Sequence, residues 1–442
     1  MSTDKEILER IAQLKEKIKL INESQQDSPK TDLSLSQPQP KERNMDDLNL
    51  NLKFKIGMIA PSGAGKTTLL NAIYYETRER LIGEGINIYH YDTEELHTTD
   101  AIKEAIANFK TCIAADNFAT PDVGGDVDST DYLFEITIGT GPDMRTAIIA
   151  FKDYPGGYVD SHDFDREMAD FIHQCSVILV PIASDYLMTW KTNQGKQDSF
   201  SMERTKLADK ALNGVNVLPR IKEWIAARKE YDSKSFLIFV PVKCEAYFND
   251  NEGLRDEHKT LMDAVKEYYH LEELAGNPEI RVEISAVDTY GIVEHQNMKI
   301  VEENSKRRLQ SIFRRRTKMG SDIKPLGAFN ILVSALYSQL STYSNDLSAQ
   351  KDEVADDLQD ITIRRNALKE KIRNRKWYQK FIAAFYDPES PQIPFLENEI
   401  DKDKVALKLL SDKNEEVLEK IKKLKGLKLN LPDRYCLIPY KE

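Results

Sequence analysis

The chain has 442 residues, of which 40% are hydrophobic, so it is long enough for more than one folded domain. Charged residues make up 31% and the formal net charge is −11, and an acidic surface of this kind argues against general nucleic-acid binding. None of the four cysteines, Cys112, Cys175, Cys244 and Cys436, lies in a C-x-x-C pair, which argues against a zinc site or a disulfide framework. No signal peptide opens the sequence, and no apolar run approaches the roughly 20 residues of a membrane-spanning helix. These features predict a cytoplasmic protein.

The first residues predict a short helix followed by a linker. Residues 1–24 carry an apolar seam at spacings of four and three, which is the pattern of a coiled coil: Ile7, Ile11, Leu14, Ile18 and Ile21. A helix this short is not stable alone, so it needs another copy of itself or the C-terminal helices as a partner. Residues 25–48 are rich in Gln, Ser, Pro and charge, without a period, and are predicted to be a disordered linker.

Residues 49–340 alternate apolar strands with amphipathic helices. Such alternation predicts an α/β domain, with a mainly parallel sheet and helices on both of its faces. The predicted strands are LKFKIGMIA, DYLFEITIG, RTAIIAFKD, SVILVPIA, SFLIFVPVK and EIRVEISAV. The predicted helices are TTLLNAIYYETRERL, DFDREMADFIHQ, residues 200–230, residues 255–274 and PLGAFNILVSALYSQL.

Residues 341–428 change to long charged helices with two apolar stripes. One stripe contains Leu347, Val354, Leu358, Ile361, Leu368 and Ile372, and the other contains Leu407, Leu410, Val417, Ile421 and Leu424. The segment WYQKFIAAFYDPESPQIPF, with its three prolines, separates them, so the pattern predicts an antiparallel α-helical coiled-coil hairpin. Residues 429–442 are predicted to be a short tail that forms a strand or a docking segment.

A glycine-rich loop follows the first predicted strand and precedes a helix. Residues 60–67 read A-P-S-G-A-G-K-T, which matches the phosphate-binding motif G-x-x-x-x-G-K-[ST] except that Ala60 replaces the first glycine. In this motif the lysine, here Lys66, reaches the β- and γ-phosphates, and Thr67 ligates Mg²⁺. The predicted phosphate-binding residues are Ala60, Pro61, Ser62, Gly63, Ala64, Gly65, Lys66, Thr67 and Thr68.

A second motif follows the strand RTAIIAFKD, which ends in Asp153-Tyr154-Pro155-Gly156. D-x-x-G is the switch II motif of GTPases, in which the aspartate holds Mg²⁺ through water and the glycine amide senses the γ-phosphate. The alternative interpretation of these residues is a strand that ends in an ordinary Pro-Gly turn.

Two further strand ends carry candidates for base recognition. Lys243-Cys244-Glu245 is a degenerate form of [NT]-K-x-D, in which Glu245 replaces the aspartate that accepts the guanine protons and Val242 replaces the asparagine that joins this loop to the phosphate loop. Ser285 and Ala286, after the last strand, match the Ser-Ala of the remaining guanine loop. The match leaves the choice between guanine and adenine open.

The order of these four motifs resembles that of GTPases of the translation-factor-related (TRAFAC) class, including divergent bacterial forms, over about residues 52–340. The resemblance implies a switch I threonine on Mg²⁺ just before the second strand. Counting back from Asp153 favours Thr130, with Thr120 as the alternative, and either could be an ordinary loop threonine. Thr130 and Lys66 are accordingly the predicted catalytic residues, and Thr67, Asp153 and Thr130 the predicted Mg²⁺ ligands.

The catalytic glutamine that commonly follows D-x-x-G is absent, since Gly157 and then Tyr158 occupy its place. The water must then be positioned from elsewhere, and intrinsic hydrolysis is expected to be slow. His162 is near only in sequence and is interpreted as a surface residue.

The leading hypothesis is therefore a Mg²⁺-dependent GTPase that binds GTP and GDP and whose helical hairpin couples the nucleotide state to a protein partner or to another copy. A second hypothesis is a membrane-associated mechanochemical GTPase that uses the basic and aromatic hairpin tip between Trp377 and Tyr386. A third is an ATPase, because the loop also resembles those of ABC ATPases, although no L-S-G-G-Q follows. A scaffold with a vestigial site is disfavoured, and a role in a bacterial defence system is suggested only by the family resemblance. The basic run from Lys306 to Lys318 is interpreted as a solvated face or as a patch for an anionic partner.

Overall fold

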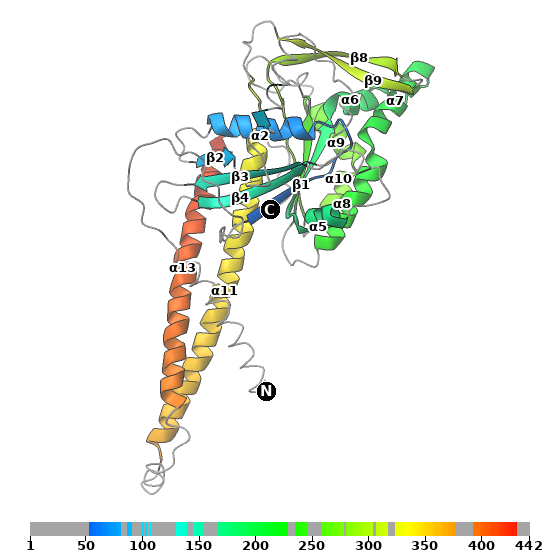
Figure 1. Cartoon of the computed structure of the whole chain (residues 1–442). Coiled ribbons are helices and arrows are strands. Elements are labelled where there is room, and N and C mark those ends of the chain that lie inside the picture. The colour runs from blue at the N-terminus through cyan, green and yellow to red at the C-terminus, as the bar shows by residue number, and fades with distance from the viewer. Residues whose placement is uncertain are drawn as a thin grey trace, which may run out of the picture. The chain divides into compact units, whose positions relative to one another are not determined.

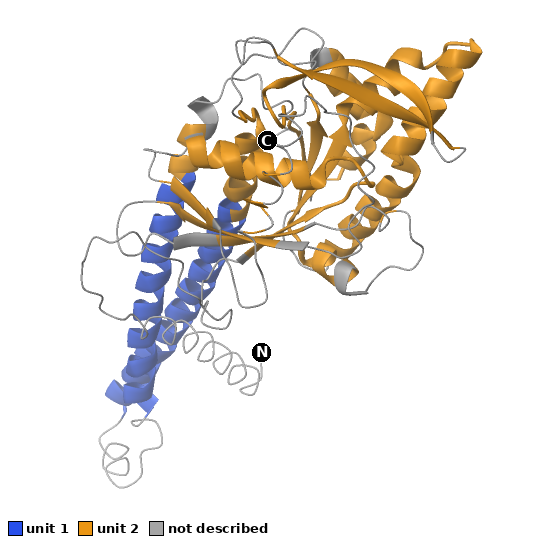
Figure 2. Ribbon diagram, turned by 45° about the horizontal axis from the view of Figure 1, so that its top comes forward, with its two compact units in different colours: residues 1–39, 340–421 blue, residues 40–339, 422–442 orange. Residues whose placement is uncertain are grey.

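The computed structural model describes most of the chain beyond residue 52. The described residues are 53–80, 86–90, 100, 102–103, 107, 130–138, 145–153, 159, 166–228, 235–244, 258–277, 280–303, 306–316, 323–375 and 392–430. They divide into two compact units (Figure 2): residues 340–375 with 392–421 form one, and those between 53 and 339 with 422–430 form the other. The predicted N-terminal helix and linker, residues 1–48, lie outside the described residues, as does the hairpin tip from Trp377 to Tyr386.

The larger unit contains a sheet of seven strands in the order β2-β3-β4-β1-β5-β6-β7. Figure 1 labels four of its strands, β1 to β4. The strands are β1 Lys53–Met58, β2 Ile86–His90, β3 Thr130–Ile138, β4 Arg145–Asp153, β5 Val177–Ala183, β6 Ser235–Val242 and β7 Ile280–Ile284. Strand β1 is parallel to β4 and β5, and β5, β6 and β7 are parallel to one another, whereas β2 and β3 are antiparallel to their neighbours. The predicted mainly parallel sheet is confirmed, and β2 is a strand that sequence reasoning missed.

In the described part of the chain, six helices contribute residues to the core on one face of the sheet. They are α5 Arg166–Gln174, α6 Ser184–Asn193, α7 Ser199–Leu212, α8 Gly214–Arg228, α9 His258–Tyr268 and α10 Leu271–Ala275. Alternate residues of β5, Ile178, Val180 and Ile182, join the core beneath them, because successive strand residues point to opposite faces. Trp224 of α8 is fully buried there, and its indole Nε1 donates to the carbonyl of Cys175 at 2.9 Å.

The other face is covered by α2 Lys66–Arg80 and by the first residues of α11, a helix that runs over Ala328–Arg373. The rings of Tyr74 in α2 and Phe134 in β3 are stacked with their centroids 5.8 Å apart. The buried carboxylate of Glu76 in α2 accepts hydrogen bonds from the backbone N–H of Gly327, at 3.2 Å, and of Phe329, at 2.9 Å. Since the first N–H groups of a helix have no partner within it, Glu76 caps the start of α11.

A two-stranded hairpin follows β7 and was not predicted. Strand β8, Val293–Glu303, pairs antiparallel with β9, Lys306–Arg315. The basic run interpreted as a solvated face or an anionic-partner patch is thus largely strand β9, and the dense charge concealed its alternating buried residues, such as Leu309 and Ser311. Ion pairs hold several of its charges: Arg307 pairs with Glu203, Arg314 with Glu294 and Arg316 with Asp288.

The smaller unit consists of two long antiparallel helices, α11 from residue 340 onward and α13 Gln392–Asn430 up to residue 421. Asn414 bonds Ser344 at 2.7 Å and Ser348 at 3.1 Å, and Lys369, later in α11, pairs with Glu397, earlier in α13. Helix α13 begins inside the predicted proline break, and Pro394 lies within its first turn, where a helix needs no backbone donor. Pro388 and Pro391 lie outside the described residues. Helix α13 also continues to Asn430, two residues into the predicted tail.

Three acidic side chains lie together on this helix pair. Burial, together with Glu399 and Asp357, raises the pKa of Asp403 from 3.8 to about 6. The folded chain then binds this proton more tightly than the unfolded chain. The resulting stabilisation is present below about pH 4 and is lost as the pH rises through about 6.

The Asp403→Asn variant should therefore be more stable than wild type at neutral pH, by about 1 kcal/mol after allowance for partial exposure. Thermal unfolding measured at several pH values checks this: the difference should shrink as the pH falls below 6, the region in which the wild-type carboxyl takes up its proton. Asp412→Asn, an exposed aspartate on the same helix, is the matched control. Equal behaviour of the two variants would contradict the expectation.

Replacing Glu76 by alanine should lower the free energy of unfolding by about 1–3 kcal/mol, because two buried N–H groups lose a charged acceptor. Urea unfolding measures the change. Glu79→Ala, an exposed glutamate on the same helix, should change stability by less than about 0.5 kcal/mol. If both variants unfold at the same urea concentration, Glu76 does not cap α11.

Candidate nucleotide-binding site

The carboxyl ends of β1, β4, β5, β6 and β7 lie at one edge of the sheet because these strands are parallel. Strand β1 is central: the chain builds β2, β3 and β4 on one side of it and then crosses to β5 on the other. In open α/β sheets, ligands bind outside the carboxyl ends of the strands at such a reversal. The edge beside β1 is therefore where a site is expected.

Residues 60–65, here named the glycine loop, connect β1 to α2. Gly63 and Gly65 have φ angles of 72° and 99°, a region that residues with a side chain avoid. A Cβ on Gly65 would also lie 3.3 Å from Cγ2 of Val242, so the loop passes close to the end of β6. The N–H of Leu69 bonds to the Gly65 carbonyl at 2.9 Å, which starts α2 directly at the loop.

Lys66 folds back over the glycine loop. Its ammonium donates to the carbonyls of Ala60 at 3.4 Å and Pro61 at 3.3 Å, and only 8% of the residue is exposed. Thr67 and Thr68 follow it in the first turn of α2. The positive end of the α2 dipole and a buried cation therefore lie at the same place.

Lys243, directly after β6, also reaches the glycine loop. Its backbone φ is 58°, and its ammonium donates to the Gly63 carbonyl at 3.3 Å while lying 5.8 Å from the ring centre of Tyr186. The sequence has Val242 where related motifs have the asparagine that joins these two loops. In the structure Lys243 itself joins them. Glu245 lies outside the described residues.

The backbone brings Thr130 and Asp153 to the same edge. Thr130 begins β3, Asp153 ends β4, and the two are directly paired in the antiparallel register. Thr120, the alternative to Thr130, lies outside the described residues, as do Gly156, Gly157, Tyr158 and His162.

Ser285 and Ala286 extend β7 along the end of β6. The N–H of Ser285 bonds to the Phe239 carbonyl at 2.9 Å, and the N–H of Val287 bonds to the Pro241 carbonyl at 2.8 Å. The Ser285 hydroxyl is buried and has no hydrogen-bond partner among the described residues. In the sheet order, two strands, β5 and β6, therefore separate this pair's strand from β1, and the pair lies beyond Lys243.

Sequence reasoning missed three residues close to Lys243: Asp185, Tyr186 and His295. Asp185 follows β5, accepts from the N–H of Tyr186 at 2.9 Å and accepts from the hydroxyl of Ser311 in β9. The Tyr186 hydroxyl donates to the Leu309 carbonyl at 3.2 Å. Asp185 and Tyr186 could have been found, because they follow a buried strand as Asp153 does. His295 could not, since its strand was not predicted.

Burial lowers the pKa of His295 from 6.5, and the nearby charge of Lys243 lowers it further, whereas Asp185 opposes both effects. The imidazole is therefore neutral in the folded chain at neutral pH. Among the described residues, no three His, Cys, Asp or Glu side chains form a metal-binding group. No helix in the described ranges is both long and apolar enough to cross a membrane.

Comparison with known proteins adds little to this geometry. No protein-family model and no curated protein matches the chain. Among solved structures the chain is similar to the GTPase-like domain of Ski7 from S. cerevisiae, determined with GTP bound, with 15% identity and a TM-score of 0.28. The alignment covers 53% of this chain and 43% of the Ski7 chain, so this chain spans less than half the length of the Ski7 chain. A likeness at this TM-score does not show what this chain does. The chemistry of the site is therefore inferred from the arrangement of its own residues.

His295→Gln should make stability less sensitive to acid. Because the folded-state pKa is lowered, the unfolded chain takes up the proton first, and the wild type loses stability as the pH falls below 6.5. Melting temperatures measured at about pH 7.5 and about pH 5.5 should differ less for the variant than for wild type. His270→Asn, at an exposed histidine, is the control. An unchanged acid sensitivity in His295→Gln would show that the imidazole is not held neutral by the fold.

Proposed function

We propose that this chain binds a guanine nucleotide with Mg²⁺ at the glycine loop and hydrolyses GTP slowly, acting as a nucleotide-dependent switch. The observation that carries this proposal is the convergence of two lysines from different strand ends on one loop. Lys66 donates to the carbonyls of Ala60 and Pro61, and Lys243 donates to that of Gly63. Two cations held at a glycine loop of an acidic protein provide a local site for phosphate.

The phosphates are bound by the loop and by Lys66. Positive φ angles at Gly63 and Gly65 allow loop N–H groups to turn toward an anion, and the start of α2 adds its dipole. The bonds from Lys66 to the loop carbonyls are long, at 3.3 and 3.4 Å, so phosphate oxygens can replace them with shorter, charge-assisted bonds.

Magnesium is the proposed cofactor, with Thr67, Thr130 and Asp153 as its protein ligands. The donor set suits Mg²⁺, which prefers hard oxygen ligands and keeps several waters. Thr67 belongs to the first turn of α2, and the pairing of Thr130 with Asp153 brings the other two residues to one position at the sheet edge. When bound, the ion neutralises charge on the β- and γ-phosphates, and Gly156 is proposed to sense the γ-phosphate.

The base is proposed to lie against Lys243, with Glu245 and the segment of Ser285 and Ala286 as the residues that recognise it. The Lys243 ammonium is held by the glycine loop and by the face of Tyr186, which leaves its apolar stem to pack on a base. A carboxylate at Glu245 would accept hydrogen bonds from the N1–H and N2–H groups of guanine. Adenine has no N1 proton, and this difference favours guanine.

Helix α2 supports the proposed coupling of nucleotide state to the helix pair. It begins at the glycine loop, and its Glu76 caps the start of α11, which continues without a break to Arg373. A shift of α2 with the γ-phosphate would therefore move the start of α11. We propose that α11 and α13 pass this change to a protein partner or to a second copy of the chain.

Calorimetry with GDP, GTP and ATP, each with and without Mg²⁺, tests the proposal. Guanine nucleotides should bind in the presence of Mg²⁺, and Lys66→Ala should lower their affinity by about 10²-fold or more, because at least two charge-assisted hydrogen bonds are lost. Lys196→Ala, at an exposed lysine, should leave affinity unchanged. ATP binding as tight as that of GTP would overturn the guanine assignment, and a folded chain that binds none of the three nucleotides would overturn the proposal itself.

A further inference from the structure

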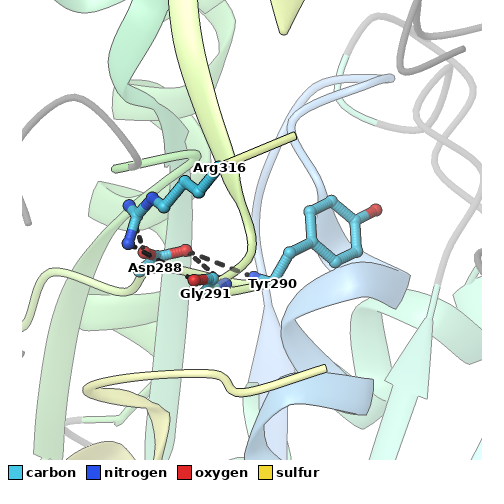
Figure 3. A network of polar contacts seen from close by, with 4 residues as sticks. All are labelled: Asp288, Tyr290, Gly291 and Arg316. Carbon is cyan, nitrogen blue, oxygen red and sulfur yellow. Dashed lines mark hydrogen bonds and ion pairs between the residues drawn. The ribbon is translucent and has the colours of Figure 1, made fainter. Parts of the chain in front are cut away.

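A buried ion pair closes the chain segment that follows Ser285 and Ala286. Asp288 is 0% exposed and Arg316 is 3% exposed, and Arg316 Nη2 lies 3.0 Å from Asp288 Oδ2. Asp288 comes soon after β7, and Arg316 comes directly after β9, so the pair joins the two ends of the β8–β9 hairpin (Figure 3).

The same two side chains also fix the backbone between them. Asp288 Oδ1 accepts from the N–H of Gly291 at 2.7 Å and from that of Tyr290 at 3.3 Å, while Arg316 Nη1 donates to the Gly291 carbonyl at 3.3 Å (Figure 3). The N–H of Arg316 bonds to the Ile292 carbonyl at 2.8 Å. Both carboxylate oxygens and both terminal guanidinium nitrogens are thus used on one turn.

Residues 323–327 hold the segment from its other side. Asp288 and Leu326 exchange backbone hydrogen bonds of 3.0 and 2.9 Å, and the Lys324 N–H bonds to the Tyr290 carbonyl at 2.9 Å. The approach is so close that a Cβ on Gly291 would lie 1.8 Å from the Lys324 carbonyl oxygen, and one on Gly327 would lie 2.3 Å from that of Ala286. Residues 285–291 therefore lie fixed between the end of β6 and residues 323–327.

A buried ion pair stabilises a turn only after both charges have been removed from water, which costs free energy. Apolar residues of similar size commonly stabilise a core as well or better, because two charges lose their hydration when buried. What the pair provides instead is one defined geometry, since each hydrogen bond is directional and the guanidinium is planar. The residues whose geometry it defines include the two that sequence analysis assigned to the base.

We propose that Asp288 and Arg316 are positioning residues for the nucleobase: they hold residues 285–291 so that Ser285 and Ala286 meet the base edge. The inference rests on the proposed nucleotide site and deepens it. The Ser285 hydroxyl, which is buried and has no hydrogen-bond partner among the described residues, is a polar group that a base edge can satisfy. The contacts given above for the glycine loop and Lys66 involve neither Asp288 nor Arg316. Loss of the ion pair is therefore expected to leave phosphate binding unchanged.

This independence gives a test with two ligands, Mg²⁺-GDP and Mg²⁺-tripolyphosphate, measured by calorimetry on the full chain. Asp288→Asn keeps an acceptor for Gly291 but removes the charge that faces Arg316, and Arg316→Lys keeps the charge but not the planar pair of donors. Both variants should lose at least about tenfold in GDP affinity, because the base-contacting loop is no longer fixed, while tripolyphosphate affinity stays within about twofold of wild type. Arg314→Ala, which breaks the pair between Arg314 in β9 and Glu294 in β8, should change neither.

Three results separate the possibilities. GDP affinity unchanged in either folded variant overturns the positioning role alone. An equal loss for GDP and tripolyphosphate overturns it as well, because it shows a general structural defect. If wild type binds GDP no more tightly than inorganic pyrophosphate, which carries the same two phosphates, the base contributes nothing and the base site of the proposed function fails with it.

Hydrogen exchange on the wild-type chain gives a measurement that does not depend on the variants folding. The amides of residues 285–291 should be more protected with Mg²⁺-GDP than with Mg²⁺-tripolyphosphate, whereas those of the glycine loop should be protected equally by both. Equal protection of residues 285–291 by the two ligands would overturn the inference.

Discussion

The parallel pairing of β1 with both β4 and β5 is the constraint on which the rest of this structure depends. It places the end of β1, and the glycine loop after it, between strands that the chain forms on opposite sides. Every strand parallel to β1 then ends at the same edge, so loops that are far apart in the sequence lie along it. The contact of Lys243 with Gly63, between residues 180 positions apart, is the direct result.

Two buried charged groups fix backbone positions around this sheet. Glu76 uses a buried carboxylate to start α11, so the helix that leaves the glycine loop and the helix that enters the smaller unit share a capping interaction. The β8–β9 hairpin is fastened at its base by Asp288 and Arg316, immediately after the segment proposed to meet the base. Both are buried charges with well-defined partners, and both act on backbone positions beside the proposed site.

The sequence predicted the strands and helices that carry strong apolar patterns. Strands β5 and β6 are buried throughout, and continuous apolar runs of this kind are typical of central parallel strands. The sequence did not predict β8 and β9. In β9, charges at Arg307, Arg308, Arg314 and Arg315 hide the alternation of buried and exposed residues, and the hairpin is stabilised where one face packs on α6 and α7. Propensity reports local preference, whereas such a hairpin is stabilised by distant partners.

For the proposed site, the sequence by itself predicted which loops carry residue types suited to phosphate and base binding, because these predictions depend on local spacing at Lys66, Asp153 and Lys243. Only the tertiary structure decided that Lys243 contacts the glycine loop itself, that Thr130 pairs with Asp153, and that Arg316 forms a buried ion pair with Asp288. Contacts of this kind join residues far apart in the chain, and their energy depends on burial and geometry that no local pattern contains. The residue types of each loop could therefore be predicted from the sequence, whereas the strand order of the sheet decides which loops lie together.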